Sequence, residues 1–211
     1  MKLYVEGGGG ANTLRTACRS GFSEFLQKAG LKGKMPRIVA CGGRGDAYDS
    51  FCTAIEAGEQ AFLLVDSEAP VDNKHQTDNT DTWQPWVHLG HREGDKWAKP
   101  LGSDDDQCHL MVQCMESWFL ADAQTLTSFF GQGFQSNRLP AVTTSVESIS
   151  KQQVYDGLAK ATANCKTKSP YGKGEHSFKI LALIAPEKVM DKSPWASRFV
   201  EELKKKMGVD R

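Results

Sequence analysis

Three carboxylates directly follow short apolar stretches of the sequence. Glu6 follows residues 2–5, whereas Asp66 and Glu68 follow the apolar run 61–65. If that second run is a strand that continues past residue 65, side chains two positions apart point to the same face, where two carboxylates repel each other. A hard divalent cation removes this repulsion, since Mg²⁺ binds one or two carboxylates together with water and phosphate oxygens. The pattern favours a metal site, and a solvated strand exit is the structural alternative.

Four consecutive glycines, residues 7–10, come immediately after Glu6. Glycine lets the backbone approach another molecule closely, and the first side chain presented there is acidic. Because a carboxylate repels a phosphate alone, we expect a phosphodiester with its metal here, with Glu6 as a ligand or a general base. A dinucleotide-binding motif counted from Gly7 would need glycine where Asn12 stands, and a Walker A match is also absent.

The elements that position these residues alternate between strands and helices. Strands are expected at 2–5, 37–40 and 61–65, with helices at 12–29, after an Asn/Thr cap, and at 47–57. A β-α-β-α-β order predicts a parallel sheet with helices packed on it. Ligands of such sheets bind at the carboxyl ends of the strands, so the three carboxylates are expected to converge there.

The rest of the chain is predicted to be mainly helical. A long polar loop is expected from residue 66 to 100, followed by a strand at 109–113 and a helix that starts within 115–122. Further helices are expected at 151–165, 177–185 and 195–207. We therefore divide the chain into a core, 1–125, and a helical C-terminal part, 126–211, packed on that core.

Composition indicates a folded protein of the cytoplasm. The 211 residues are 39% hydrophobic and 25% charged, without a secretory leader or an apolar span of membrane length. Six cysteines without a CxxC pair fit reduced thiols, and Cys108, His109 and Cys114 favour buried side chains over a zinc site.

The net charge of zero conceals an uneven distribution. Lys and Arg outnumber Asp and Glu by eight to two in residues 1–44 and by thirteen to seven in residues 151–211, whereas residues 45–150 carry five against seventeen. An acidic middle between basic ends suits carboxylates that bind cations beside side chains that contact phosphates. Solvation of unrelated surfaces explains the same counts equally well.

Two motifs resemble the TOPRIM catalytic core of topoisomerases, primases and OLD-type nucleases. They are residues 4–7, Tyr-Val-Glu-Gly, and residues 64–68, Leu-Val-Asp-Ser-Glu, where the usual second motif is Asp-x-Asp. Residues 113–122, Gln-Cys-Met-Glu-Ser-Trp-Phe-Leu-Ala-Asp, are further similar to an uncharacterised bacterial TOPRIM-like family often encoded beside ABC-type ATPases in anti-phage loci. This resemblance covers nearly the whole chain. It implies an α/β, Rossmann-like TOPRIM fold with a mainly parallel sheet and a helical C-terminal part.

The resemblance also implies further site residues. Glu116 is expected near the cations, although a carboxylate favoured at a helix N-terminus is the alternative. Lys173, in the segment 171–177, is expected to neutralise charge in the transition state, and the alternative is a loop lysine. The phosphate is expected to contact Gly7, Gly8, His176 and the planar fork of Arg44. The alternative for His176 is a histidine in a helix-capping region, and the alternative for Arg44 is a surface arginine paired with Asp46.

These expectations combine into a nuclease that uses Mg²⁺ or Mn²⁺ to cleave DNA or RNA. Its catalytic residues would be Glu6, Asp66, Glu68 and Lys173, with Glu116 as a further metal ligand. An ATPase subunit would control it in anti-phage defence, so the isolated chain is expected to be weakly active or silent. The apolar face of helix 195–207 would pack in the core or bind that partner. The alternative is a non-catalytic TOPRIM-like subunit that binds the ATPase.

Overall fold

A four-stranded parallel sheet forms the centre of the computed structural model, which describes residues 1–209. The strand order is β2-β1-β3-β4, and each neighbouring pair is parallel. Every residue of β3 is buried, as expected for a central strand covered on both faces. The predicted α/β fold with a parallel sheet is confirmed. The strands are β1 (Lys2–Gly8), β2 (Arg37–Gly42), β3 (Ala61–Asp66) and β4 (Cys108–Met111).

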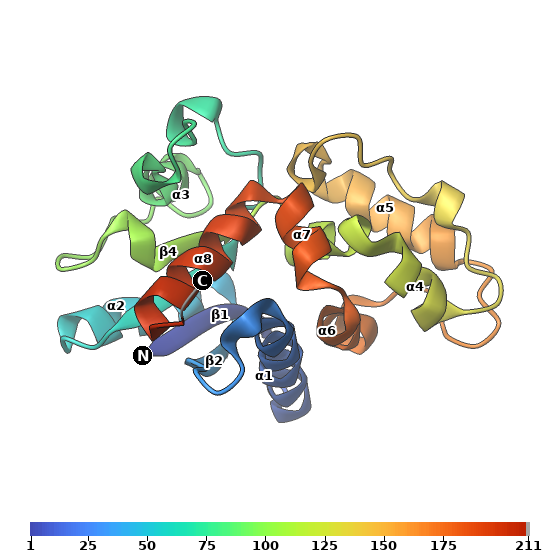
Figure 1. Cartoon of the computed structure of the whole chain (residues 1–211), viewed down its shortest axis with the longest axis horizontal. Helices are drawn as coiled ribbons and strands as arrows, with labels where there is room; N and C mark the ends of the chain where they lie inside the picture. Colours follow the sequence, from blue (N-terminus) through green and yellow to red (C-terminus); the bar gives the residue numbers. More distant parts are fainter. Residues whose placement is uncertain (210–211) are drawn as a thin grey trace.

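Helices cover both faces of this sheet (Figure 1). Alternate strand residues point to opposite faces, so Leu3 and Leu64 belong to one buried cluster while Tyr4 and Leu63 belong to the other. The first face packs on α1 (Asn12–Leu26), α6 (Lys173–Leu183) and α8 (Pro194–Met207). The second face packs on α2 (Arg44–Glu56) and α3 (Pro85–His91).

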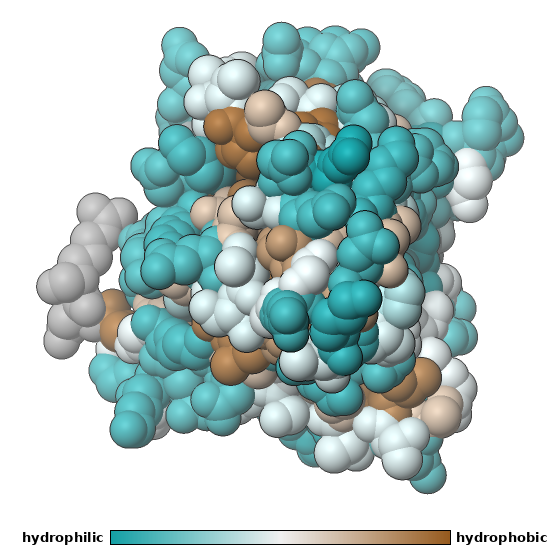
Figure 2. All heavy atoms as spheres, turned by 90° about the vertical axis from the view of Figure 1, so that its right-hand side faces the viewer, coloured by the Kyte–Doolittle hydropathy of each residue, from teal (hydrophilic) through white to brown (hydrophobic). Residues whose placement is uncertain are grey.

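The C-terminal helical part shares its core with the sheet. Phe130 and Leu158 lie in the same buried cluster as Leu3 and Phe22. In Figure 1 α4 and α5 lie at the end of the molecule opposite α2, and Figure 2 shows that this end is mainly hydrophilic with separate small apolar patches. The remaining helices are α4 (Ala123–Phe130), α5 (Lys151–Thr162) and α7 (Pro186–Lys192).

The segment between β3 and β4 is more ordered than the predicted long loop. It contains α3, which begins at Pro85, a residue whose fixed φ suits the first helical position. Trp83 and Trp86 are buried against the sheet. Three short 3₁₀ turns complete the segment, namely η2 (Asn73–His75), η3 (Thr80–Thr82) and η4 (Asp105–Gln107).

Several helix boundaries differ from the prediction. Helix α2 begins at Arg44 instead of residue 47, and α6 covers Lys173–Leu183 instead of 177–185. Ala11 precedes α1 without a side-chain cap, so the predicted Asn/Thr cap is wrong. Helix α7 was not predicted. A π-helical turn, η1 (Gln27–Leu31), extends α1, and 3₁₀ helices form at η5 (Met115–Asp122), η6 (Ser136–Arg138) and η7 (Val146–Ser148).

The helices and the cysteines can be compared with the membrane-span and thiol expectations. Within residues 1–209, no helix combines the length and apolar character needed to cross a bilayer. The cysteines are all free thiols, and Cys108 and Cys114 are buried, as the sequence favoured.

Candidate active site

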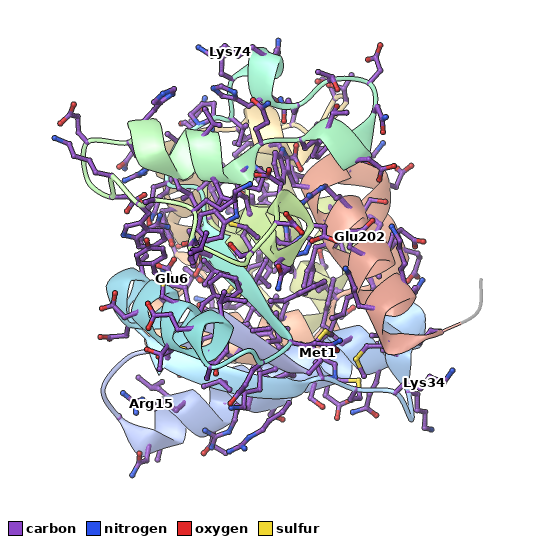
Figure 3. The ribbon with its side chains drawn as sticks, turned by 90° about the vertical axis from the view of Figure 1, so that its left-hand side faces the viewer. Met1, Glu6, Arg15, Lys34, Lys74 and Glu202 are labelled. Atoms are coloured by element: carbon purple, nitrogen blue, oxygen red, sulfur yellow. The ribbon has the colours of Figure 1, made fainter. Side chains whose placement is uncertain are left out.

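The structure brings Glu6, Asp66 and Glu68 together at the carboxyl end of the sheet. One carboxylate oxygen from each residue lies within 4.8 Å of the other two. Strands β1 and β3 are parallel neighbours with Val5 opposite Leu64, so the residues that follow meet at one edge. Figure 3 shows Glu6 and Arg15 at this end of the sheet, with Met1 and Lys34 at the other. We call these three residues the carboxylate triad.

Glu68 reaches the triad from a turn and not from a continuation of the strand. The strand ends at Asp66, and Glu68 has a φ of 62°, in the left-handed region. Its backbone N–H donates to the carbonyl of Gln113 (3.1 Å), while the N–H of Gln113 donates to Ser67 Oγ (2.7 Å). Lys151 Nζ lies 2.6 Å from Glu68 Oε2. A local turn bonded to Gln113, in the segment after β4, therefore places this carboxylate, and the strand does not continue as far as Glu68.

Asp66 is the most deeply buried member of the triad, with 3% of its surface exposed. Its Oδ1 accepts a hydrogen bond from the N–H of Met115 (2.8 Å), and its own N–H donates to Glu6 Oε2 (3.1 Å). Burial raises the pKa of Asp66 well above its usual value, and the negative charges of Glu6 and Glu116 raise it further. Burial also raises the pKa of Glu6, against the opposing effect of Arg44. Holding the triad ionised without a cation is therefore costly.

Arg44 is committed to interactions inside the protein. It donates to Glu6 Oε2 (3.2 Å) and to the carbonyl of Asp66, and its guanidinium forms a two-point pair with Asp95 (3.2 and 2.6 Å). The guanidinium also lies 4.9 Å from the ring centre of Trp97. Asp46, its expected partner, instead accepts from the N–H of Gly43 at the start of α2. Arg44 positions Glu6, and the structure does not place it on the cavity as a phosphate ligand.

Glu116 lies outside the triad. It is fully buried, and its two oxygens accept hydrogen bonds from three hydroxyl groups: Tyr155 (2.9 Å), Tyr171 (2.9 Å) and Ser177 (3.0 Å). Burial raises the pKa of both tyrosines, which keeps them protonated as donors. The structure thus does not bring this predicted metal ligand to the other carboxylates. The negative charge of Glu116 nevertheless contributes to the raised pKa of Asp66.

Lys173 is the first residue of α6 and faces the triad across a cavity of about 410 Å³. Burial lowers the pKa of its ammonium group, but the carboxylates of Glu116, Asp66 and Glu6 outweigh this effect and raise it. Lys173 therefore stays charged near neutral pH. The cavity is lined by Glu6, Gly7, Gly8, Gly9, Leu14, Gly42, Asp66, Met115, Lys173, Gly174 and Phe178.

The glycines form one wall of this cavity, as close approach of a ligand requires. Gly7 and Gly8 have φ values of 136° and 90°, which other residues rarely adopt. A Cβ on Gly8 would come within 2.8 Å of the Arg15 backbone. Any side chain here would strain the backbone and narrow the cavity.

His176 is turned away from the cavity. Its ring is 2% exposed, and its Nδ1 accepts a hydrogen bond from the N–H of Gly172 at the start of α6 (3.0 Å). Burial lowers its pKa, which favours the neutral ring that can accept this bond. The structure supports the capping alternative and does not bring His176 to a phosphate.

Some residues of the site were not identified from the sequence. Lys151 and Gln113 hold Glu68, Asp95 holds Arg44, and Phe178 lines the cavity. These residues lie far from their partners along the chain. Their spacing therefore carries no signal of the contacts they make.

Comparison with known proteins identifies the family. Residues 5–204 match a family described as a domain of unknown function, DUF4276. The chain belongs to the DUF4276 family. Neither the curated proteins nor the solved structures provided a match. Because the description of DUF4276 assigns no activity, the geometry of the site is the basis for a functional proposal.

Proposed function

We propose that this DUF4276 protein is a Mg²⁺- or Mn²⁺-dependent nuclease that hydrolyses phosphodiester bonds in DNA or RNA. The main support is the convergence of the carboxylate triad beside a cavity that also contains Lys173. Carboxylates gathered around a cation, with a separate lysine facing them, suit a reaction at a charged phosphate group.

The donor set of the triad fits a hard divalent cation. Its three residues offer carboxylate oxygens, which Mg²⁺ and Mn²⁺ prefer. Burial is the main reason that the pKa values of Asp66 and Glu6 are raised, and a bound cation would offset this cost of ionising them. When bound, such an ion supplies a more acidic water and balances negative charge on the phosphate.

The protein's own groups then bind and orient the substrate. The ammonium group of Lys173 stabilises negative charge that develops on the phosphate oxygens during attack by water. Gly7 and Gly8 let the sugar-phosphate backbone approach the triad. The first turns of α1 and α6 contribute Leu14 and Lys173 to the cavity, so the positive ends of both helices lie near the bound phosphate.

The resemblance to TOPRIM proteins extends this proposal to a setting. On that basis, the enzyme is a cytoplasmic effector of anti-phage defence that an ABC-type ATPase subunit holds or releases. The apolar face of α8, for which core packing or partner binding was expected, packs in the core, because Phe199, Val200 and Leu203 are fully buried there. An ATPase would therefore contact another surface.

The direct test is cleavage of single- and double-stranded DNA and RNA by the purified chain with Mg²⁺, Mn²⁺ or a chelator. We expect metal-dependent cleavage that falls at least about 100-fold in Glu6→Gln and in Asp66→Asn, since each variant loses several kcal/mol of charge stabilisation. Glu24→Gln, at an exposed position on α1, is the matched control and keeps wild-type activity. High protein concentrations are included because the isolated chain is expected to be weakly active. Unchanged cleavage in both triad variants would show that the assignment is wrong.

A further inference from the structure

The cavity beside the triad has two chemically different walls. Glu6, Asp66 and Lys173 make one wall charged, whereas Leu14, Met115 and Phe178 make the other apolar. Leu14 and Phe178 are only partly buried, so the cavity keeps apolar surface beside ionised groups. The hydrolysis of a phosphodiester by itself does not require that apolar wall.

Phe178 is fixed in position by close packing around glycines. A Cβ on Gly7 would lie 3.0 Å from Cζ of the Phe178 ring, and a Cβ on Gly21 would lie 2.7 Å from the Phe178 carbonyl oxygen. On the other side, Leu14 borders Gly9 and Gly174, where an added Cβ would contact its methyl groups at 3.8 Å. The glycines thus let Phe178 and Leu14 pack closely against the backbone beside the cavity, and both side chains keep part of their surface exposed.

We infer that this apolar wall holds one unpaired nucleobase, so that the substrate is a single strand of nucleic acid. This inference rests on the proposed nuclease function. In a duplex the neighbouring bases cover both faces of each base, whereas an unpaired base can stack on an aromatic side chain. A cavity of about 410 Å³ is of the size that holds one small ligand, which fits a single nucleotide and not a duplex.

A basic segment leads into the same cavity. Residues 157–174 contain Lys160, Lys166, Lys168 and Lys173 and no Asp or Glu, and all four lysines are exposed. Backbone phosphates of a strand that leaves the cavity would be attracted along this segment. The strand would thus have one base on the apolar wall and its neighbouring phosphates among lysines.

The test measures binding of labelled oligonucleotides to the Glu6→Gln protein, which binds without cutting. The probes are single-stranded DNA, single-stranded RNA, blunt duplexes, and single strands with one base removed at successive positions. We expect single strands to bind at least about tenfold more tightly than duplexes. Removal of one particular base should weaken binding about 5- to 150-fold, the range that corresponds to stacking on one aromatic ring. The arms with DNA and RNA show which sugar the site accepts.

Substitutions in the apolar wall test whether this loss of oligonucleotide affinity depends on Phe178. Phe178→Ala should weaken binding of the intact strand by the same factor, with little further loss when the base is removed, whereas Phe178→Tyr retains binding. Leu183→Ala, at an exposed position on the same helix, is the matched control. Removal of the base leaves the protein unchanged, so that arm remains decisive even where Phe178→Ala folds poorly.

The outcomes separate this inference from the proposed function. If metal-dependent cleavage depends on Asp66 but duplexes and base-free strands are bound as tightly as intact single strands, the single-strand inference is wrong and the nuclease proposal stands. If no nucleic acid is bound or cut with either metal, both are wrong.

Discussion

The triad and Glu116 are two carboxylate sites in one protein, and they differ in what surrounds the oxygens. Both oxygens of Glu116 accept hydrogen bonds from neutral hydroxyl groups, and the residue is fully buried. Asp66 instead has one backbone N–H donor at Oδ1 and lies within reach of two other carboxylates. The first arrangement is complete within the protein, whereas the second is electrostatically unfavourable until a cation is added.

This difference shows why acidic residues alone are weak evidence of a metal site. A carboxylate whose oxygens accept several hydrogen bonds from hydroxyl groups stabilises the fold. One whose pKa is raised by burial and by neighbouring carboxylates makes the metal-free fold less stable when it is ionised. The following experiments test that distinction, beginning with the largest expected effect.

Removal of the Glu116 carboxylate should be far more destabilising than neutralisation of Asp66. Glu116→Leu leaves the Tyr155 hydroxyl without its acceptor and removes one partner of Tyr171 and of Ser177, which can still bond to each other and to the Lys173 carbonyl. We therefore expect a loss of about 1 to 3 kcal/mol. Asp66→Asn keeps the acceptor for Met115 and removes a repelled charge, so its stability should equal or exceed wild type. Urea unfolding in the presence of a chelator measures both. A larger loss of unfolding free energy in Asp66→Asn than in Glu116→Leu would contradict this prediction.

Metal ions should stabilise only proteins with an intact triad. A ligand bound by the native state at 100 times its Kd contributes about 2.7 kcal/mol, so Mg²⁺ or Mn²⁺ should raise the Tm of wild type by several degrees. The shift should disappear in Asp66→Asn and persist in Glu116→Gln, provided the latter folds. Thermal unfolding at increasing metal concentration gives the comparison, with Ca²⁺ as a further cation. An equal loss of the metal-induced Tm shift in both variants would indicate that Glu116 also binds the metal.

The stability of the metal-free protein should depend on pH through Asp66. Its folded-state pKa lies above its unfolded value, so the folded protein binds the proton more tightly. The associated stability is fully present below about pH 4 and is lost as the pH rises through the folded pKa. Relative to Asp66→Asn, wild type should therefore lose about 1.4 kcal/mol for each unit of that pKa difference. Urea unfolding of both proteins across this pH range tests the sign, and parallel curves would contradict it.

The smallest effect is expected from Lys151, whose ammonium group lies beside Glu68. The pair is partly exposed, with 29% and 23% of the two side chains accessible, so Lys151→Met should cost less than about 1 kcal/mol. Removing this competing positive charge should tighten Mn²⁺ binding about two- to fivefold, since it lies beside a triad oxygen. Titration calorimetry measures the affinity, and Lys160→Met is a control on the same helix. Weaker binding in Lys151→Met would show instead that the lysine positions Glu68.

The sheet was predictable because its local signals agree with the fold. The apolar runs at 2–5, 37–40 and 61–65 are bounded by glycines or polar residues, and parallel pairing brings Glu6 and Asp66 to one edge. Helix α6 was placed too late because Gly172 and Gly174 are typical of a loop, whereas packing against α1 starts the helix between them. Tertiary contacts here override local propensity.

The site was only partly predictable, because several of its contacts are long-range. The sequence gives no indication that Asp95 pairs with Arg44 or that Tyr155 and Tyr171 surround Glu116. The left-handed conformation of Glu68 depends on Gln113, which belongs to the segment after β4. Residue type and spacing identified the triad, but not which other charged residues are already paired inside the fold.

The contact between α1 and α6 has a consequence for the newly made chain. Lys28 Nζ donates to the carbonyl of Ile184, which is 156 positions later, and Phe178 closes the cavity over Gly7. On a ribosome the N-terminal strands and the triad emerge first, whereas Lys173 and Phe178 are made only after residue 172. Nascent and C-terminally truncated chains therefore lack the complete cavity. A chain that stops before residue 173 would thus contain the triad without the lysine and the aromatic ring that the proposed function requires.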